Sequence, residues 1–99
     1  MRPLLNHDCR VVASSDQLTA MLGDEAVILG TRDDVYYGLD PVGARIWSLV
    51  QEPRTLDDVA DAIAAEFDVA RARALADLLV LAGELVDRGL LDVVPAPAS

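Results

Sequence analysis

Lysine is absent from this chain of 99 residues, so its eight basic residues are all arginines, and they are outnumbered by 17 acidic residues. The net charge is −9 and the isoelectric point is about 4.2. A DNA-binding protein draws its affinity from Lys and Arg side chains that neutralise phosphates. Because the arginines are also spread along the chain, the composition argues against a nucleic acid partner and favours a partner of basic or neutral character.

Cysteine and histidine each occur once. Cys9 cannot form a disulfide bond within the chain, which fits the reducing environment of the cytoplasm. His7, Asp8 and Cys9 are adjacent, but neighbouring side chains on an extended segment point to opposite sides, and no further His or Cys completes a metal or nucleophile cluster. The glycines are scattered and form no phosphate-binding loop. We therefore expect no catalytic residue, no metal site and no cofactor.

Long apolar segments are also missing. No stretch approaches the roughly 20 uninterrupted apolar residues that cross a bilayer, and no basic segment followed by an apolar run opens the chain, so we expect no secretion signal. Hydrophobic residues nevertheless make up 53% of the sequence, which excludes disorder. The sequence predicts a single cytoplasmic domain over residues 1–94, and a tail at 95–99 that has no means of packing.

Short apolar runs bounded by turn-forming residues precede residue 40, and this pattern is typical of strands. The runs at 9–13, 26–29 and 35–39 predict three strands. The short connection at 30–34 predicts a hairpin between the last two of them. The segment 17–22 is interpreted as either a loop or a single helical turn.

Helical spacing of apolar residues begins at residue 40. Asp40 can cap a first helix, and Pro41 fits its first turn. Thr55 opens a second helix, and a third extends over about 70–88 and is closed by Gly89. The predicted fold class is therefore α+β, with three N-terminal antiparallel strands followed by three helices.

Three segments resemble PqqD-like proteins, which are also called RiPP recognition elements (RiPP denotes a ribosomally made, post-translationally modified peptide). These segments are 37–47 (YGLDPVGARIW), 55–60 (TLDDVA) and 85–91 (LVDRGLL). A free-standing chain of this length is most similar to the leader-recognition protein of lasso-peptide biosynthesis.

The resemblance implies a winged helix-turn-helix-like fold that binds the leader segment of a precursor peptide. In the family, the leader adds as an extra strand beside the third strand, in a groove whose other wall is the third helix. The bound leader is then presented to a separate leader peptidase, a cysteine protease, and to a macrolactam-forming cyclase. The resemblance thus implies a non-catalytic adaptor for antibiotic biosynthesis.

The predicted third strand is a suitable edge for such strand addition, which needs free backbone N–H and C=O groups. Alternation places Val35 and Tyr37 on one face and Tyr36 and Gly38 on the other. An alternative interpretation is that both tyrosines are ordinary strand residues. The candidate peptide-binding residues of this segment are Asp34, Val35, Tyr36, Tyr37 and Gly38.

The third helix has more apolar residues than one core stripe needs. Val80 lies nearly opposite that stripe, flanked by the small residues Ala76 and Gly83, so a peptide backbone could approach closely there. Ala74 and Leu81 form a second apolar flank, and the sequence leaves open which flank faces the leader. Simple packing under the N-terminal strands is the alternative. Acidic side chains near the groove would attract Lys or Arg of a leader. The candidate peptide-binding residues of the third helix are Arg73, Ala76, Asp77, Val80, Gly83 and Glu84.

A winged-helix regulator that binds DNA is the alternative function. It would need arginines grouped on one recognition helix. Arg71 and Arg73, at the start of the third helix, form the only such group in the sequence.

Overall fold

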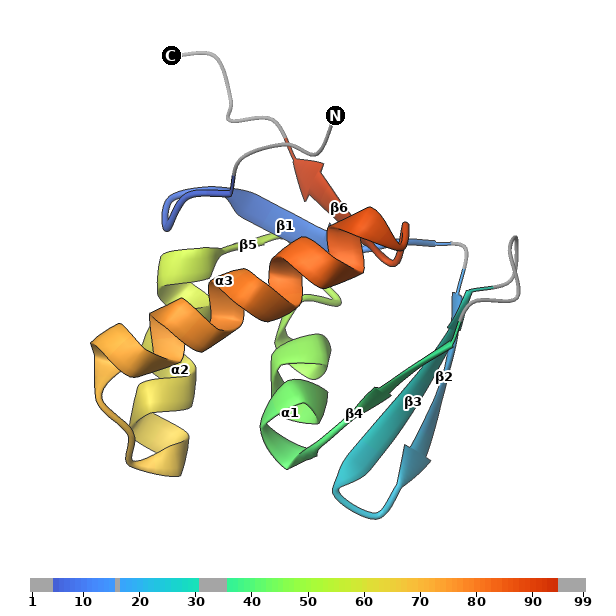
Figure 1. Ribbon diagram of the computed structural model, residues 1–99, viewed down its shortest axis with the longest axis horizontal. Coiled ribbons are helices and arrows are strands. Elements are labelled where there is room, and N and C mark those ends of the chain that lie inside the picture. Colours follow the sequence, from blue (N-terminus) through green and yellow to red (C-terminus); the bar gives the residue numbers. More distant parts are fainter. Residues whose placement is uncertain (1–4, 16, 31–35, 95–99) are drawn as a thin grey trace.

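The computed structural model describes residues 5–15, 17–30 and 36–94, and these form an α+β fold of six strands and three helices (Figure 1). The strands are β1 (Arg10–Ala13), β2 (Gln17–Leu22), β3 (Glu25–Gly30), β4 (Tyr36–Leu39), β5 (Arg54–Thr55) and β6 (Leu91–Val94). The helices are α1 (Pro41–Leu49), α2 (Leu56–Phe67) and α3 (Arg71–Asp87).

The strands form two antiparallel sheets with the orders β5-β1-β6 and β2-β3-β4. Helix α3 packs on α2 and β6, whereas α1 packs on β3 and β4. Figure 1 shows the β2-β3-β4 sheet extending from the side of α1, away from the β5-β1-β6 sheet. Within the described residues, β4 pairs with β3 alone and is an edge strand of its sheet.

One hydrophobic core joins the two sheets to the helices. Val11 of β1, Ile28 of β3 and Leu56 of α2 are fully buried. Burying a side chain of this size contributes about 1.5–3 kcal/mol. Trp47 of α1 is 3% exposed, and its Nε1 donates to Thr19 Oγ1 of β2 at 2.9 Å. This contact satisfies the buried indole and ties the β2-β3-β4 sheet to α1.

The helix boundaries follow the local signals in the sequence. The Asp40 carboxylate accepts from the Gly43 backbone N–H at 2.7 Å, and Thr55 Oγ1 accepts from the Asp58 N–H at 3.1 Å, so both expected N-caps are formed. Gly89 follows α3 with φ +73°, the left-handed conformation in which glycine is favoured. The α+β class, the three helices and the antiparallel pairing of β3 with β4 are confirmed.

The interpretation of residues 17–22 as a loop or helical turn was wrong, because all six residues form β2. They pair with β3 from Gln17↔Gly30 to Leu22↔Glu25 across a turn at Gly23 and Asp24. Gly23 has φ +70°, which a tight hairpin turn requires. The Gly-Asp pair between two apolar runs was the signal for this hairpin.

The expectation that the strands come first and the helices follow also needs correction. β5 lies between α1 and α2, and β6 follows α3. The first predicted strand, β1, pairs with β5 and β6 rather than with its neighbours in the chain. Short strands such as β5 are defined by their partners, so the sequence around them gives little local signal. The tail expected at 95–99 lies outside the described residues.

Candidate functional site

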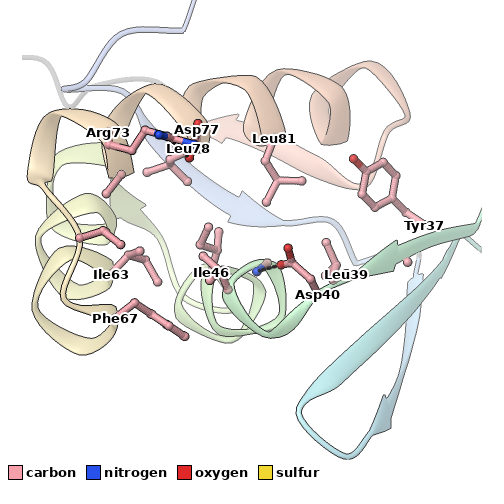
Figure 2. A pocket seen from close by; sticks show the side chains of 15 residues that line it. Tyr37, Leu39, Asp40, Ile46, Ile63, Phe67, Arg73, Asp77, Leu78 and Leu81 are labelled. Atoms are coloured by element: carbon pink, nitrogen blue, oxygen red, sulfur yellow. Dashed lines mark hydrogen bonds and ion pairs between the residues drawn. The ribbon is translucent and has the colours of Figure 1, made fainter.

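A groove of about 720 Å³ separates β4 from α3. Figure 2 shows side chains of α3 on one side and those of β4, α1 and α2 on the other. Leu78 and Leu81 contribute apolar surface from α3, and Ile46 and Phe67 contribute it from α1 and α2. The groove therefore offers an apolar floor beside the unpaired edge of β4, which is the arrangement that an added peptide strand requires.

The β4 strand presents alternate side chains to different surroundings. Leu39 is buried in the core and Tyr37 is half-buried at the groove, whereas Tyr36 is 70% exposed on the opposite face. Gly38 lines the groove with no heavy atom within 4 Å of the place where a Cβ would lie. Its backbone lines the groove, whereas a Cβ at this position would point to the opposite face, on the side of Tyr36.

The start of α1 is held close to the end of β4 by a glycine. A Cβ on Gly43 would lie 3.1 Å from Leu39 Cδ2 and 3.3 Å from Asp40 Oδ1, closer than ordinary packing distances. The absence of a side chain lets the first turn of α1 pack directly on Leu39. The chain thus passes from an open edge strand into a capped helix within two residues, and this fixes the floor of the groove.

Tyr37 spans the groove near the C-terminal end of α3. Its hydroxyl donates to the Glu84 carboxylate, and the Arg88 guanidinium lies 5.2 Å from the centre of its ring. The hydrogen bond to Glu84, and then burial, raise the pKa of the Tyr37 phenol above its ordinary value of 10.0. The phenol is therefore neutral at physiological pH and connects β4 to α3.

An ion pair lies at the other end of the groove, where Arg73 Nε donates to Asp77 Oδ2 at 3.1 Å. The two residues are one helical turn apart and both side chains are exposed, so the pair stabilises α3 little by itself. Its carboxylate and guanidinium can instead contact charged or polar groups of a bound peptide. The groove is thus apolar in its middle and polar at both ends.

Arg71 is held by acidic side chains of α2. Its guanidinium contacts Asp57 Oδ1 at 2.7 Å and also pairs with Asp61. With Arg73 paired to Asp77, both arginines at the start of α3 are neutralised within the protein. The grouping that motivated the DNA-binding alternative is therefore not a free basic patch.

Groups of three or more His, Cys, Asp or Glu side chains that could hold a metal ion do not occur among residues 5–15, 17–30 and 36–94. Within the same ranges, no helix is both long enough and apolar enough to cross a membrane.

Comparison with protein families assigns most of this sequence to a known family. Residues 25–91 match the PqqD family, whose description is coenzyme PQQ synthesis protein D. The match covers more than half of the chain and includes β3, β4, all three helices and both sides of the groove. The chain belongs to the PqqD family.

Two solved structures share this PqqD-family fold. TbiB1 in complex with the TbiA(beta) leader peptide is 35% identical in sequence, with a TM-score of 0.77 over 86% of this chain and 99% of the TbiB1 chain. The tRNA-dependent lantibiotic dehydratase MibB from Microbispora sp. 107891 is 20% identical, with a TM-score of 0.61 over 90% of this chain and 8% of MibB. The MibB likeness concerns the fold alone. Among curated proteins, none matches the chain. The family match and the TbiB1 likeness confirm the resemblance to RiPP recognition elements.

The structure brings part of the predicted PqqD-type site together. Four predicted residues line the groove, and Glu84 joins them through Tyr37. Tyr36 lies on the exposed opposite face of the β2-β3-β4 sheet. Asp34 and Val35 lie outside the described residues. The four lining residues are Tyr37, Gly38, Arg73 and Asp77.

The strip of Ala76, Val80 and Gly83 does not line this groove. Ala76 and Val80 are exposed, and Gly83 is buried elsewhere. Successive helical residues are about 100° apart, so Val80 points well to one side of Leu81, which does line the groove. Of the two flanks that the sequence left open, the flank of Ala74 and Leu81 lines the groove.

Sequence reasoning missed the floor of the groove. Ile46, Ile63 and Phe67 belong to the helically spaced apolar residues of α1 and α2, which predicted helices but no groove. Their helical spacing was visible, but spacing alone cannot show that the packing of three helices leaves these side chains accessible from one side. Phe67, at the end of α2, is half-buried, and nothing in the sequence around it distinguishes it from a core residue.

Proposed function

We propose that this PqqD-family chain is a non-catalytic adaptor that binds the leader segment of a ribosomal precursor peptide. The single observation that carries the proposal is the open edge of β4 beside the apolar groove under α3. The likeness to TbiB1, which was solved with a leader peptide, supports the same role.

The leader joins the β2-β3-β4 sheet as a fourth strand next to β4. Its backbone pairs with the N–H and C=O groups that alternate residues of β4 direct away from β3, which gives affinity with little dependence on leader sequence. Asp34, Val35 and Tyr36, which precede Tyr37 and Gly38 in the chain, extend the proposed pairing.

Selectivity comes from side chains that enter the groove. An apolar leader side chain packs among Ile46, Phe67 and Leu81, where burial of one large side chain contributes about 1.5–3 kcal/mol. Asp77 and Glu84 attract a basic leader residue near either end, and Arg73 accommodates an acidic one. The preferred leader is therefore an extended segment with an apolar anchor flanked by charged residues.

Lasso-peptide maturation is the proposed pathway. The adaptor presents the bound leader to a separate leader peptidase, a cysteine protease, and then to a macrolactam-forming cyclase, without contributing a catalytic group or a cofactor. The proposed location is the cytoplasm, where precursor peptides are made. The neighbouring reading frames test this assignment, because a short precursor, a peptidase and a cyclase are expected beside the gene.

Calorimetric titration with the leader of that neighbouring precursor tests the binding site. Leu81→Arg places a charge in the groove and is expected to weaken binding at least tenfold, which corresponds to about 1.4 kcal/mol. Val80→Arg is the matched control, because it adds the same charge one position away, at a side chain that is 65% exposed outside the groove. Its affinity is expected to stay within twofold of the wild type.

Melting temperatures of both variants show whether each remains folded. A loss of binding in Val80→Arg but not in Leu81→Arg would move the leader to the strip of Ala76, Val80 and Gly83. Unchanged affinity in both folded variants, or no affinity in the wild type, would contradict the proposed groove. Binding of random duplex DNA at low salt would favour the regulator instead.

A further inference from the structure

The β2-β3-β4 sheet has an apolar outer face, on the side away from α1. The register aligns Leu18, Leu29 and Tyr36 in one row across the three strands, and Ala20, Val27 and Gly38 in the next. We define the outer sheet face by its six side chains Leu18, Ala20, Leu22, Val27, Leu29 and Tyr36.

An antiparallel sheet with one face in water normally places polar side chains on that face. Here the opposite holds, since Leu18, Leu22 and Tyr36 are 62%, 63% and 70% exposed. Glu25 is the charged residue on the described part of this face. A contiguous apolar surface of this kind is typical of a site that another protein covers.

The outer sheet face is continuous with the proposed leader site. β4 contributes Tyr36 to the outer face and Tyr37 to the groove, because adjacent residues of a strand point to opposite sides. A leader strand paired with β4 therefore has side chains on both faces, and those on the outer face lie beside Tyr36. Any protein seated there contacts the adaptor and the bound leader together.

We propose that the outer sheet face is the docking surface for the enzyme that processes the bound leader. This inference rests on the proposed function, and it adds a partner surface distinct from the groove. The enzyme binds a composite sheet of three adaptor strands and one leader strand, so leader binding completes the surface that the enzyme recognises.

The charge distribution favours such a partner over a second copy of this chain. The chain carries a net charge of −9, and Asp24 and Glu25 lie at the β2-β3 turn, at one end of the outer sheet face. Two copies packed face to face would bring like charges together. A partner with an apolar patch bordered by Lys or Arg would match both the face and its acidic end.

The probe is the purified leader peptidase encoded beside the adaptor gene, acting on the full precursor peptide. The double variant Leu18→Lys/Leu29→Lys places two charges in the central apolar row. We expect its leader affinity by calorimetry to stay within twofold of the wild type, and its support of precursor cleavage to fall at least tenfold. The matched control Ala65→Lys/Ala72→Lys adds the same charge at exposed helical positions and is expected to support cleavage fully.

Circular dichroism reports folding, and Leu18→Thr/Leu29→Thr, which keeps strand-favouring side chains, replaces the lysine variant if that variant unfolds. Full support of cleavage by the folded face variant would overturn the inference. So would a loss of leader affinity, which would make the face part of the leader site. Sedimentation velocity tests whether a second copy of the chain covers the face. If the wild type is a dimer and the face variant is a monomer that still supports cleavage, the face serves self-association. A wild type that binds no leader refutes the proposed function instead.

Discussion

At the scale of single residues, Tyr37 has two roles that can be separated. Its backbone belongs to the open edge of β4, while its side chain crosses to Glu84 and Arg88 on α3. The side chain therefore sets the spacing between the two walls of the groove, and its chemistry can be followed in solution.

Tyr36→Phe leaves Tyr37 as the only tyrosine, because the sequence contains two. Titration of the phenolate absorbance is expected to show a pKa above 10.0, since Glu84 accepts the phenol proton and burial disfavours the anion. Adding Glu84→Gln is expected to lower this pKa toward its ordinary value. An unchanged pKa in the double variant would contradict the hydrogen bond to Glu84. The lost bond should cost about 0.5–1.5 kcal/mol of stability.

His7 ties the N-terminal segment to the first turn of α2. Its Nδ1 lies 2.7 Å from Asp57 Oδ2, and its backbone carbonyl accepts from the Asp57 N–H at 2.8 Å. The hydrogen bond and charge of Asp57 raise the pKa of His7 above 6.5. The same hydrogen bond, with a second from Arg71, lowers the pKa of Asp57 below 3.8.

These shifts give a pH dependence with a defined sign. The contribution of His7 is fully present below pH 6.5 and is lost as pH rises through its raised pKa. The contribution of Asp57 is present above pH 3.8 and is lost as pH falls through its lowered pKa. We expect urea unfolding of the wild type to lose stability relative to His7→Gln as pH increases above about 6.5. If the unfolding free energies of the wild type and His7→Gln change in parallel with pH, the interaction between His7 and Asp57 is refuted.

At the scale of elements, the β2-β3 hairpin depends on its turn. Gly23→Ala forces a side chain into the left-handed region at φ +70° and is expected to cost about 1–2 kcal/mol. Gly38→Ala is the matched control, because neither glycine has an atom within 4 Å of an added Cβ and Gly38 has no positive φ. Thermal unfolding should therefore separate the two, and equal destabilisation would mean that backbone conformation is not the cause.

The elements also show what the sequence could and could not predict. The helices were predictable because caps are local: Asp40 and Gly43 are three residues apart. β2 was not, because Leu, Ala, Met and Gln favour helices, and the pairing with β3 overrides that preference. The helical period of the apolar residues predicted the core stripe of α3, but it gave no reason to prefer the flank of Val80 or that of Leu81 as the groove wall. Only the position of β4 decides which flank lines the groove.

At the scale of the whole molecule, excess negative charge opposes the compact state. The radius of gyration is 12.9 Å, so at 0.01 M ionic strength, where the Debye length is about 30 Å, the excess acidic side chains repel one another across most of the molecule. Raising the salt concentration to 0.5 M is expected to raise the melting temperature by a few degrees.

The exposed ion pairs act in the opposite direction, because salt weakens them. Arg45–Glu66 at 3.0 Å and Arg73–Asp77 at 3.1 Å are examples, and each such pair contributes about 0–1 kcal/mol. A melting temperature that falls with added salt would mean that these pairs outweigh the general repulsion.

The single tryptophan has a practical consequence for studying this fold. Trp47 is buried in α1, and its indole nitrogen is bonded to Thr19 of β2, so its surroundings change whenever the β2-β3-β4 sheet shifts against the helices. Its emission maximum is therefore an intrinsic, label-free reporter of sheet movement. A red shift on unfolding and a smaller spectral change on peptide addition can be recorded on the unmodified chain.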